Sequence, residues 1–346
     1  MTLPATLPVP RTPDPADAPA VNWGILAPGW IARLFVSAAK AFTRQRFVAV
    51  GSRSAERAQA FADEFSIPKV YDSYEALVSD PEVQAIYVAS PHSEHYAQAK
   101  LALDAGKNVL VEKAFTRSAD QAQELADLAS AKGLALMEAM WTRFLPRTDV
   151  VRQLIEDGAL GELETVHADH GQPLLHVPRL VRPELAGGAL LDLGIYPVSW
   201  AVFALGLPSR VQAVGSLTEL GVDRQEAIIL DGFEAHPHAR AVLHTTMAAA
   251  TPTAAMVAGS EARVELDGPF YAPGPVRLVD PEGTVLTRPE NKQIVHQGLS
   301  HECAAFAQLV ADGRTESPLL PVSETVGIMR ILDEVRRQLG VVYPGE

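Results

Sequence analysis

The sequence predicts an α/β protein in which a doubly wound parallel sheet is followed by an α+β domain with a large open, mainly antiparallel sheet. Two observations predict it. From residue 21 to about 140, short apolar runs alternate with amphipathic runs, and this alternation is typical of parallel sheets with crossover helices. After residue 140, longer stretches alternate apolar and polar residues, which is typical of antiparallel strands with one covered face.

Each element of the first domain has local signals. We expect strands at residues 23–27, 46–52, 84–90, 107–113 and 134–140. We expect helices at 30–40, at 54–65, at 118–133 and immediately before Ala105-Gly106. Ser54 and Ser118 are residues that cap helix N-termini, and Gly106 and Gly133 suit helix C-termini.

The second domain has fewer clear elements. We expect helices at 148–156, 187–205 and 323–340, and strands at 163–170, 240–250 and 262–268. There is no internal repeat. The predicted organisation is therefore an arm over residues 1–20, the parallel-sheet domain over 21–140 and the α+β domain over 141–346.

Composition excludes several classes of function. Among the 346 residues, 29 Lys and Arg stand against 42 Asp and Glu, a net charge of −13, so nucleic acid and anionic membranes are not expected partners. We find no apolar run of membrane-spanning length. The single cysteine, Cys303, excludes an internal disulfide and a multi-cysteine zinc site, and no histidine spacing predicts a metal site.

Residues 1–20 are rich in proline and alanine and lack the basic start and apolar core of a secretion signal. This composition favours a flexible tail over the alternative, an extended arm that wraps a partner subunit. We expect a cytoplasmic protein.

The turn after the first strand resembles the dinucleotide fingerprint G-x-G-x-x-G/A. Residues 27–32 read A-P-G-W-I-A, so the second glycine is Gly29, and Ala27 replaces the first. Pro28 fixes its own φ and is expected to bias Ala27 toward an extended conformation. The backbone amides at the start of the next helix would bind a pyrophosphate. These observations predict a Rossmann domain whose cofactor contacts include Ala27, Pro28, Gly29, Trp30 and Ile31.

The end of the second strand indicates which cofactor is bound. An NAD-preferring fold carries Asp or Glu about 20 residues after the glycine turn, whereas this chain has Ser52, Arg53 and, one helical turn later, Arg57. A hydroxyl and two guanidinium groups suit a 2′-phosphate. We therefore predict NADP(H) as the preferred cofactor, with NAD(H) possible; the alternative is that both arginines are solvated surface residues.

Several motifs together resemble the Gfo/Idh/MocA oxidoreductase family. They are SPHSEHYAQAKLALDAGKNVLVEK followed by AFT, and GGALLDLGIYP in the second domain. LMEAMWTRFLP and the ending GRTESPLLP…YPGE resemble the branch with dimeric dihydrodiol dehydrogenases, 1,5-anhydrofructose reductases and NADP-dependent xylose dehydrogenases. The resemblance extends from residue 23 to residue 346.

The resemblance implies a catalytic lysine, Lys113, although Ala114 replaces the proline of the family's Glu-Lys-Pro motif. It also implies that Tyr196 donates the proton. Asp192 lies four residues before Tyr196 and would share its helix face. A nearby ammonium group would stabilise the phenolate of such a tyrosine; the alternative is a core tyrosine and a helix aspartate.

The resemblance implies further contacts with the cofactor and the substrate. The additional cofactor residues would be Ser90, His92, His95, Glu112, Lys113 and Arg143. The substrate residues would be Trp141, His170, Val177, Asp192 and Tyr196. The segment around His170 and Val177 is less aromatic than an arene dihydrodiol binder should have, which favours a sugar or a cyclic polyol.

These inferences predict an NADP(H)-dependent oxidoreductase that transfers hydride between nicotinamide and a CH–OH/C=O group of a sugar, a cyclic polyol or a trans-dihydrodiol. Two alternatives stay open: an NAD(P)-dependent glycosidase that acts by transient oxidation and elimination, and a non-catalytic NADP sensor. We expect a small carbohydrate or cyclic diol as substrate, and a homodimer or homotetramer formed through the C-terminal sheet.

Overall fold

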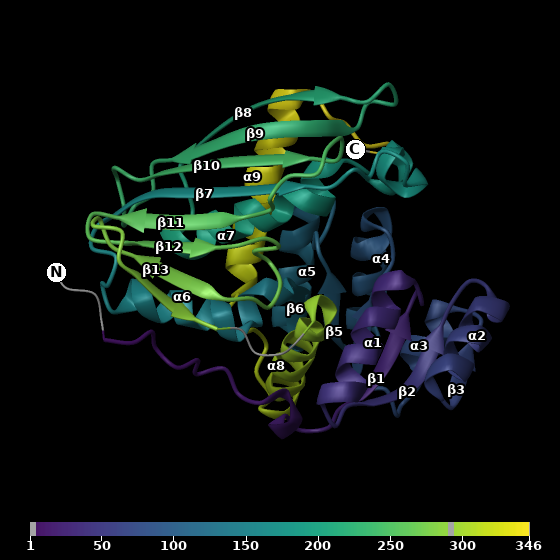
Figure 1. The fold of residues 1–346 in the computed structure, drawn as a ribbon. Helices are drawn as coiled ribbons and strands as arrows, with labels where there is room; N and C mark the ends of the chain where they lie inside the picture. The colour runs from purple at the N-terminus through teal and green to yellow at the C-terminus, as the bar shows by residue number, and fades with distance from the viewer. Residues whose placement is uncertain (1–4, 290–293, 346) are drawn as a thin grey trace. The chain divides into compact units, whose positions relative to one another are not determined.

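The computed structural model describes residues 5–289 and 294–345, which fall into two compact units (Figure 1). We call Pro13–Phe144 with Ile294–Val326 the Rossmann unit. The described residues 5–12, 145–289 and 327–345 form the mixed-sheet unit. The division differs from the predicted domains because residues 294–326, far along the chain, group with the first domain.

The Rossmann unit contains a six-stranded sheet whose pairs are all parallel, in the order β3-β2-β1-β4-β5-β6. The strand order reverses between β1 and β4, the position at which doubly wound sheets bind ligands. The strands are β1 Asn22–Leu26, β2 Arg46–Gly51, β3 Lys69–Tyr71, β4 Ala85–Val88, β5 Asn108–Glu112 and β6 Leu136–Ala139.

The helices of this unit begin and end at the predicted signals. Ser54 accepts a hydrogen bond from the amide of Arg57, and Ser118 accepts one from Gln121. Gly106 and Gly133 follow helices with positive φ angles. The helical segments are η1 Pro15–Asp17, α1 Trp30–Phe42, α2 Ala55–Phe65, α3 Tyr74–Ser79, α4 His92–Asp104, α5 Ala119–Lys132, η2 Trp141–Phe144, η6 Val295–Gly298 and α8 Leu299–Ala311.

Aromatic residues join α1 and α8 to one face of this sheet. Trp23 of β1 lies 5.6 Å from Phe35 of α1 and 5.5 Å from Phe306 of α8, between ring centroids. Phe35 also stacks on Tyr87 of β4 at 3.9 Å. All four side chains are fully buried. Helix α8 therefore completes the Rossmann core, which explains why residues 294–326 belong to this unit.

The mixed-sheet unit contains an eight-stranded sheet in the order β14-β13-β12-β11-β7-β10-β9-β8. Figure 1 labels these strands except β14. The pair β7–β10 is parallel and the other pairs are antiparallel, as predicted. The strands are β7 Leu163–Gly171, β8 Arg210–Leu217, β9 Asp223–Asp231, β10 Arg240–Thr246, β11 Ala255–Gly259, β12 Arg263–Leu266, β13 Val276–Val279 and β14 Val285–Arg288.

Helices cover one face of this sheet. Helix α7 packs on β7 and β10, and a π-helical turn, η5, precedes it. The other face leaves apolar side chains exposed: Val214 at 72%, Ile229 at 41% and Val242 at 42%. The helical segments are α6 Pro146–Glu156, η3 Pro178–Val181, η4 Pro183–Leu185, η5 Leu190–Gly194, α7 Ile195–Leu205 and the greater part of α9 Val322–Leu339.

The segment Pro183–Leu205 corrects one expectation. It is long and apolar enough to cross a membrane by length and composition, although we expected no run of that length. However, 94% of its apolar window is buried inside the molecule. Its side chains therefore pack in the core of the mixed-sheet unit.

Two residues of the arm, Val9 and Arg11, contact helix α6 of the mixed-sheet unit, and the flexibility of the arm stays a prediction. The amide of Arg11 donates to Asp149 at 2.6 Å, and its guanidinium group pairs with Asp149 at 2.8 Å and with Glu156 at 2.9 Å. Gln153 donates to the carbonyl of Val9 at 2.9 Å. Acidic residues in the first and last turns of the adjoining helix α6 thus hold Arg11, an interaction that composition alone does not predict.

Candidate active site

The turn between β1 and α1 has the form of a dinucleotide loop, but Ala27 is not extended. Its φ angle is +65°, in the left-handed region that glycine adopts without cost. The expected effect of Pro28 on Ala27 was therefore wrong. The amide of Ala27 donates to the carbonyl of Gly51 at 3.1 Å, and this tertiary contact accompanies the turn at the position where the fingerprint has its first glycine.

The start of α1 offers unused backbone donors. Gly29 is the N-cap residue, without a side-chain cap, and the first intrahelical bond to its carbonyl comes from Arg33 at 3.2 Å. The amides of Trp30, Ile31 and Ala32 therefore have no acceptor within the helix. A Cβ on Gly29 would lie 3.7 Å from its nearest neighbour, the carbonyl oxygen of Ala89. The loop can accept an anion, and its backbone can be approached closely.

Two arginines follow the end of β2, as predicted. Ser52 is buried, and its hydroxyl accepts a hydrogen bond from the amide of Ser54 at 3.1 Å, which leaves its proton to donate. Arg53 and Arg57 are exposed. Burial raises the pKa of the neighbouring Tyr74, whereas the guanidinium group of Arg53 at its hydroxyl opposes the rise. A phosphate near Ser52 would find two cations there.

His95 has a different environment from the one expected. It is fully buried, and its two ring nitrogens each lie 2.8 Å from a backbone carbonyl oxygen, those of Ala114 and Ser90. Burial lowers its pKa to about 4, although the two carbonyl groups favour the protonated ring. His95 therefore joins the loop after β4 to the loop after β5, and its contact with the cofactor stays a prediction. His92 is also buried, edge-to-face with His95 at 5.6 Å.

Lys113 follows directly after β5, where doubly wound sheets bind ligands. It is half-buried, and its peptide bond to Ala114 is cis. The carboxylate of Glu112 accepts hydrogen bonds from the hydroxyl of Tyr87 and from the amide of Lys113, the latter at 3.1 Å. These bonds place Glu112 as a support for the lysine, whereas the sequence predicted a cofactor contact.

Trp141 and Arg143 lie together in η2 with different roles. Trp141 stacks on His296 at 6.3 Å, and His296 meets Trp30 edge-to-face at 5.4 Å. This row of rings therefore ends at the dinucleotide loop. Arg143 is buried and pairs with Glu324 at 2.5 Å, so it holds the start of α9 where the sequence predicted a cofactor contact. Sequence reasoning missed His296, because no motif surrounds it.

A second cluster of candidate residues lies in the mixed-sheet unit, around η5 and α7. Tyr196 is 8% exposed and stacks on Tyr271 at 4.6 Å. His170 meets both rings, at 5.4 Å for Tyr196 and 4.7 Å for Tyr271. Burial and the charge of Asp192 raise the pKa of Tyr271. Asp192, Tyr196 and His170 thus surround one ring, Tyr271, which the sequence did not single out.

Hydrogen bonds fix the ring of His170. Its Nδ1 donates to the carbonyl of Leu193 at 3.1 Å, and its Nε2 accepts from the amide of Gln172 at 2.9 Å. The same amide donates to the hydroxyl of Tyr271 at 3.3 Å. These contacts are consistent with a neutral His170 in one tautomer. The cluster therefore presents hydroxyl, amide and aromatic groups in a fixed arrangement.

Asp192 and Val177 differ in their surroundings. The guanidinium group of Arg179, which is about half-exposed, reaches Asp192 at 3.2 Å. Val177 packs against an apolar cluster that includes Leu180 and Leu193. Of these two predicted substrate residues, Asp192 therefore offers a charged group, and Val177 offers an apolar surface.

Lys113 belongs to the Rossmann unit, whereas Asp192 and Tyr196 belong to the mixed-sheet unit. Their joint action therefore stays a prediction. Within residues 5–289 and 294–345, no group of three or more His, Cys, Asp or Glu residues could hold a metal ion.

Comparisons with known proteins agree with both units. The family model described as "Oxidoreductase family, NAD-binding Rossmann fold" matches residues 21–140, and the GFO/IDH/MocA C-terminal domain matches residues 148–265. Trans-1,2-dihydrobenzene-1,2-diol dehydrogenase of Homo sapiens is 35% identical over 332 residues, covering 94% of this chain and 98% of the human protein. D-xylose 1-dehydrogenase (NADP(+)) of Hypocrea jecorina is 36% identical over 368 residues, covering 94% and 93%.

Solved structures show the same fold. A 3-ketoreductase from Actinomadura kijaniata, in complex with TDP-benzene and NADP, is 27% identical and has a TM-score of 0.77, covering 92% of this chain and 97% of its own. Levoglucosan dehydrogenase has a TM-score of 0.83 at 18% identity, covering 95% and 100%. The two family matches and the relatives that cover almost the whole chain show that this protein belongs to the Gfo/Idh/MocA family of oxidoreductases.

Proposed function

We propose that this protein is an NADP(H)-dependent oxidoreductase that interconverts a CH–OH group and a C=O group of a small hydroxylated substrate. One observation carries the proposal: the unused amides at the start of α1 belong to the same unit as Ser52, Arg53 and Arg57. The amides suit a pyrophosphate, and the hydroxyl group and the two guanidinium groups suit a 2′-phosphate. The names of the NADP-dependent xylose dehydrogenase and the NADP-bound ketoreductase support this choice. NAD(H) lacks the 2′-phosphate, so we expect weaker binding.

The bound cofactor would accept or deliver hydride at the nicotinamide ring. During oxidation, we propose that Tyr196 takes the proton from the substrate hydroxyl while hydride leaves the carbinol carbon. Lys113 would stabilise the developing negative charge on that oxygen. A cation near Tyr196 also lowers the free energy of its phenolate. Asp192 would orient the substrate, with Arg179 as its ion-pair partner.

The surroundings of Tyr196 support a sugar or cyclic polyol as the substrate class, over a trans-dihydrodiol. Gln172, His170 and Tyr271 form a hydrogen-bonded network beside the tyrosine. Amide and hydroxyl groups of this kind form hydrogen bonds with substrate hydroxyl groups. A substrate that lacks such a hydroxyl group leaves them unpaired and binds more weakly. A trans-dihydrodiol has two hydroxyl groups and would pair with fewer of these polar groups than a sugar or cyclic polyol.

We also propose that the exposed face of the mixed sheet joins two or more copies of the chain. Ile229 and Val242 are directly paired across β9 and β10, and Val214 lies on the neighbouring strand β8. All three are well exposed. An apolar face of this kind is typical of an interaction surface. Light scattering that gives the mass of a single chain at micromolar concentration would contradict this proposal.

The test of the reaction is a screen of aldoses, anhydrosugars, inositols and trans-dihydrodiols with NADP⁺, followed at the absorbance of reduced nicotinamide. We expect sustained reduction with at least one sugar or cyclic polyol, and a lower rate with dihydrodiols. Cleavage of a glycoside without net reduction would favour the glycosidase. Tight NADP binding without any turnover would favour the sensor.

Two substitutions test the assigned chemistry on whichever substrate is found. Lys113→Met and Tyr196→Phe should each lower kcat by about 100-fold or more, as expected for acid–base catalysis. The double variant should be little worse than the poorer single variant, because residues that act as one unit are not additive. NADP affinity should stay unchanged for Tyr196→Phe. A wild-type rate for either single variant would contradict the assignment.

A further inference from the structure

The helical segment that carries Asp192 and Tyr196 is held at its start by a carboxylate from another element. Asp223, the first residue of β9, accepts a hydrogen bond from the amide of Leu190 at 2.5 Å. Burial raises the pKa of Asp223 to about 6, and backbone hydrogen bonds from Leu190 and Ala189 oppose that rise. η5 has no side-chain cap of its own. Asp223 therefore supplies the cap that the local sequence lacks.

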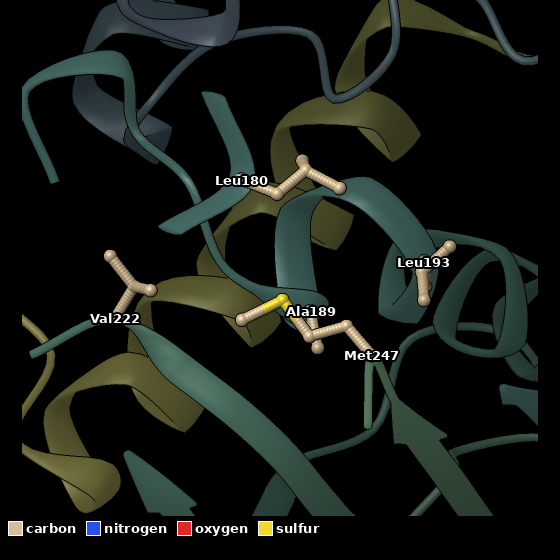
Figure 2. Packing of buried hydrophobic residues seen from close by; sticks show 5 residues of the cluster. All are labelled: Leu180, Ala189, Leu193, Val222 and Met247. Atoms are coloured by element: carbon tan, nitrogen blue, oxygen red, sulfur yellow. The ribbon is translucent and has the colours of Figure 1, made fainter. Parts of the chain in front are cut away.

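The surroundings of Asp223 leave it no other position. The residue is fully buried, and a Cβ at Gly188 would overlap its carboxylate, so only glycine fits there. Gly188 also has a φ angle of +123°. Figure 2 shows a cluster of buried apolar residues that includes Val222, immediately before Asp223, and Ala189, immediately before Leu190. The other members of the cluster are Leu180, Leu193 and Met247.

A second buried carboxyl group, that of Glu226, lies beside the same turn. It is 1% exposed, and neither of its oxygens has a hydrogen-bond partner among the described residues. A Cβ on Gly194 would lie 3.3 Å from its Oε1. Burial, with the charge of Asp223, raises the pKa of Glu226 well above its ordinary value.

The two carboxyl groups differ in what stabilises their charge. Asp223 faces backbone amides and the field of Arg336 in α9, whereas only Asp223 acts on Glu226. Hydrogen bonds and an opposite charge favour the ionised form, and burial alone favours the neutral form. Burial therefore disfavours the charge of Glu226 more than that of Asp223, whose charge the backbone amides and Arg336 stabilise at the start of the helix.

We propose that Asp223 is a positioning residue for the reaction, because it fixes the π-helical turn that sets the direction of Asp192 and Tyr196. The turn departs from an α-helix, since the amide of Ile195 bonds to the carbonyl of Leu190. Without the cap, the buried amide of Leu190 loses its acceptor, and the turn must repack to find another. The proposal rests on the assignment of Tyr196 to proton transfer given above.

The experiment compares Asp223→Asn and Asp223→Ala with Glu226→Gln in the full-length protein, on a substrate identified by the screen. Glu226→Gln is the matched control, because it alters the neighbouring buried carboxyl group and caps no amide. We expect Asp223→Ala to lower kcat at least 30-fold while the Kd for NADP changes less than twofold. Asp223→Asn keeps one acceptor oxygen and should recover part of the loss. Glu226→Gln should stay within threefold of wild type.

Two further readouts separate positioning from a general loss of stability. With Tyr196 as the proton acceptor, the rate of oxidation should rise with pH through an apparent pKa. That rise should move along the pH axis in the Asp223 variants and stay in place in Glu226→Gln. Hydrogen exchange on the wild-type protein should show the amides of Ala189 and Leu190 among the protected ones. Hydrogen exchange needs no variant, so it tests the cap at the start of the turn even if the Asp223 variants fail to fold.

Three results would overturn the inference: a wild-type kcat in folded Asp223→Ala, rapid exchange of both amides, or an equal loss in Glu226→Gln. Tyr196→Phe is measured alongside. If Tyr196→Phe keeps wild-type turnover, the proposed proton transfer fails. If Tyr196→Phe is inactive and Asp223→Ala is fully active, only the positioning role fails.

Discussion

Replacing Ala27 by glycine should stabilise this protein, although the same change destabilises most helices and strands. Ala27 has a φ angle of +65°, and a residue with a Cβ pays roughly 1–2 kcal/mol in that region. Glycine avoids this cost but loses about 0.5–1 kcal/mol through the larger entropy of its unfolded chain. The expected net gain in the free energy of unfolding is about 0.5–1 kcal/mol, or roughly 2 °C in Tm for a chain of this size.

The matched control is Ala60→Gly, in the middle of α2 on its exposed side. It makes the same chemical change at a helical φ angle and should cost about 1 kcal/mol. Denaturant unfolding of both variants, monitored by circular dichroism, measures the difference, while fluorescence titration measures NADP affinity. We expect the affinity of Ala27→Gly to stay near that of wild type, because the turn already has the conformation that glycine prefers. A loss of stability equal to that of Ala60→Gly would refute the left-handed turn.

Three other predictions concern the Rossmann unit. Gly29→Val should abolish NADP binding without lowering Tm much, because a Cβ there meets only an ordinary contact at 3.7 Å; normal titration of NADP would show that the loop is misassigned. Arg53→Ala should weaken NADP by about 1.5–3 kcal/mol, roughly 10- to 150-fold, and leave NAD nearly unchanged; equal losses for both cofactors would place Arg53 away from the 2′-phosphate. Burial raises the pKa of Glu138 from 4.5 to about 7, so the folded state binds its proton more tightly and stability falls as pH rises between these values. In the wild type this fall in the free energy of unfolding should amount to about 3 kcal/mol, and Glu138→Gln should remove it. If the free energies of unfolding of the two proteins depend on pH in the same way from pH 4.5 to 8, the prediction is wrong.

The alternation of strands and helices in the first domain was visible in the sequence because buried parallel strands are short continuous apolar runs. The caps at Ser54 and Ser118 depend on contacts within one helical turn, so they could also be predicted. β8, β9, β11, β13 and β14 were not singled out. Several of these strands are short or carry polar side chains on an exposed face. The grouping of α8 with the first domain depends on Phe306, a contact distant in sequence.

For the candidate site, sequence patterns indicated which residues are present but not what each one contacts. Gly29 and Arg53 stand where the fingerprint puts them, because a strand–turn–helix unit is local. His95 and Arg143 matched family positions, yet carbonyl groups and Glu324 engage them inside the fold. Tyr271 and Asp223 lie far along the chain from Tyr196 and Leu190, and no motif joins them. Their roles require the tertiary structure.

The parallel pairing of β7 with β10 has a consequence for how the chain folds. These strands are neighbours in the sheet, but residues 172–239 lie between them, including η5, α7 and the hairpin of β8 and β9. Closing so long a loop lowers the entropy of the chain before the contacts between the strands can form. Strand pairs that are distant in sequence therefore slow folding. Helix α7 packs on both strands, so its complete platform does not exist until β10 has been synthesised. In a nascent chain that ends before Arg240, the tyrosine that we assign to proton transfer therefore lacks part of the surface on which its helix rests, and the Rossmann core still lacks α8.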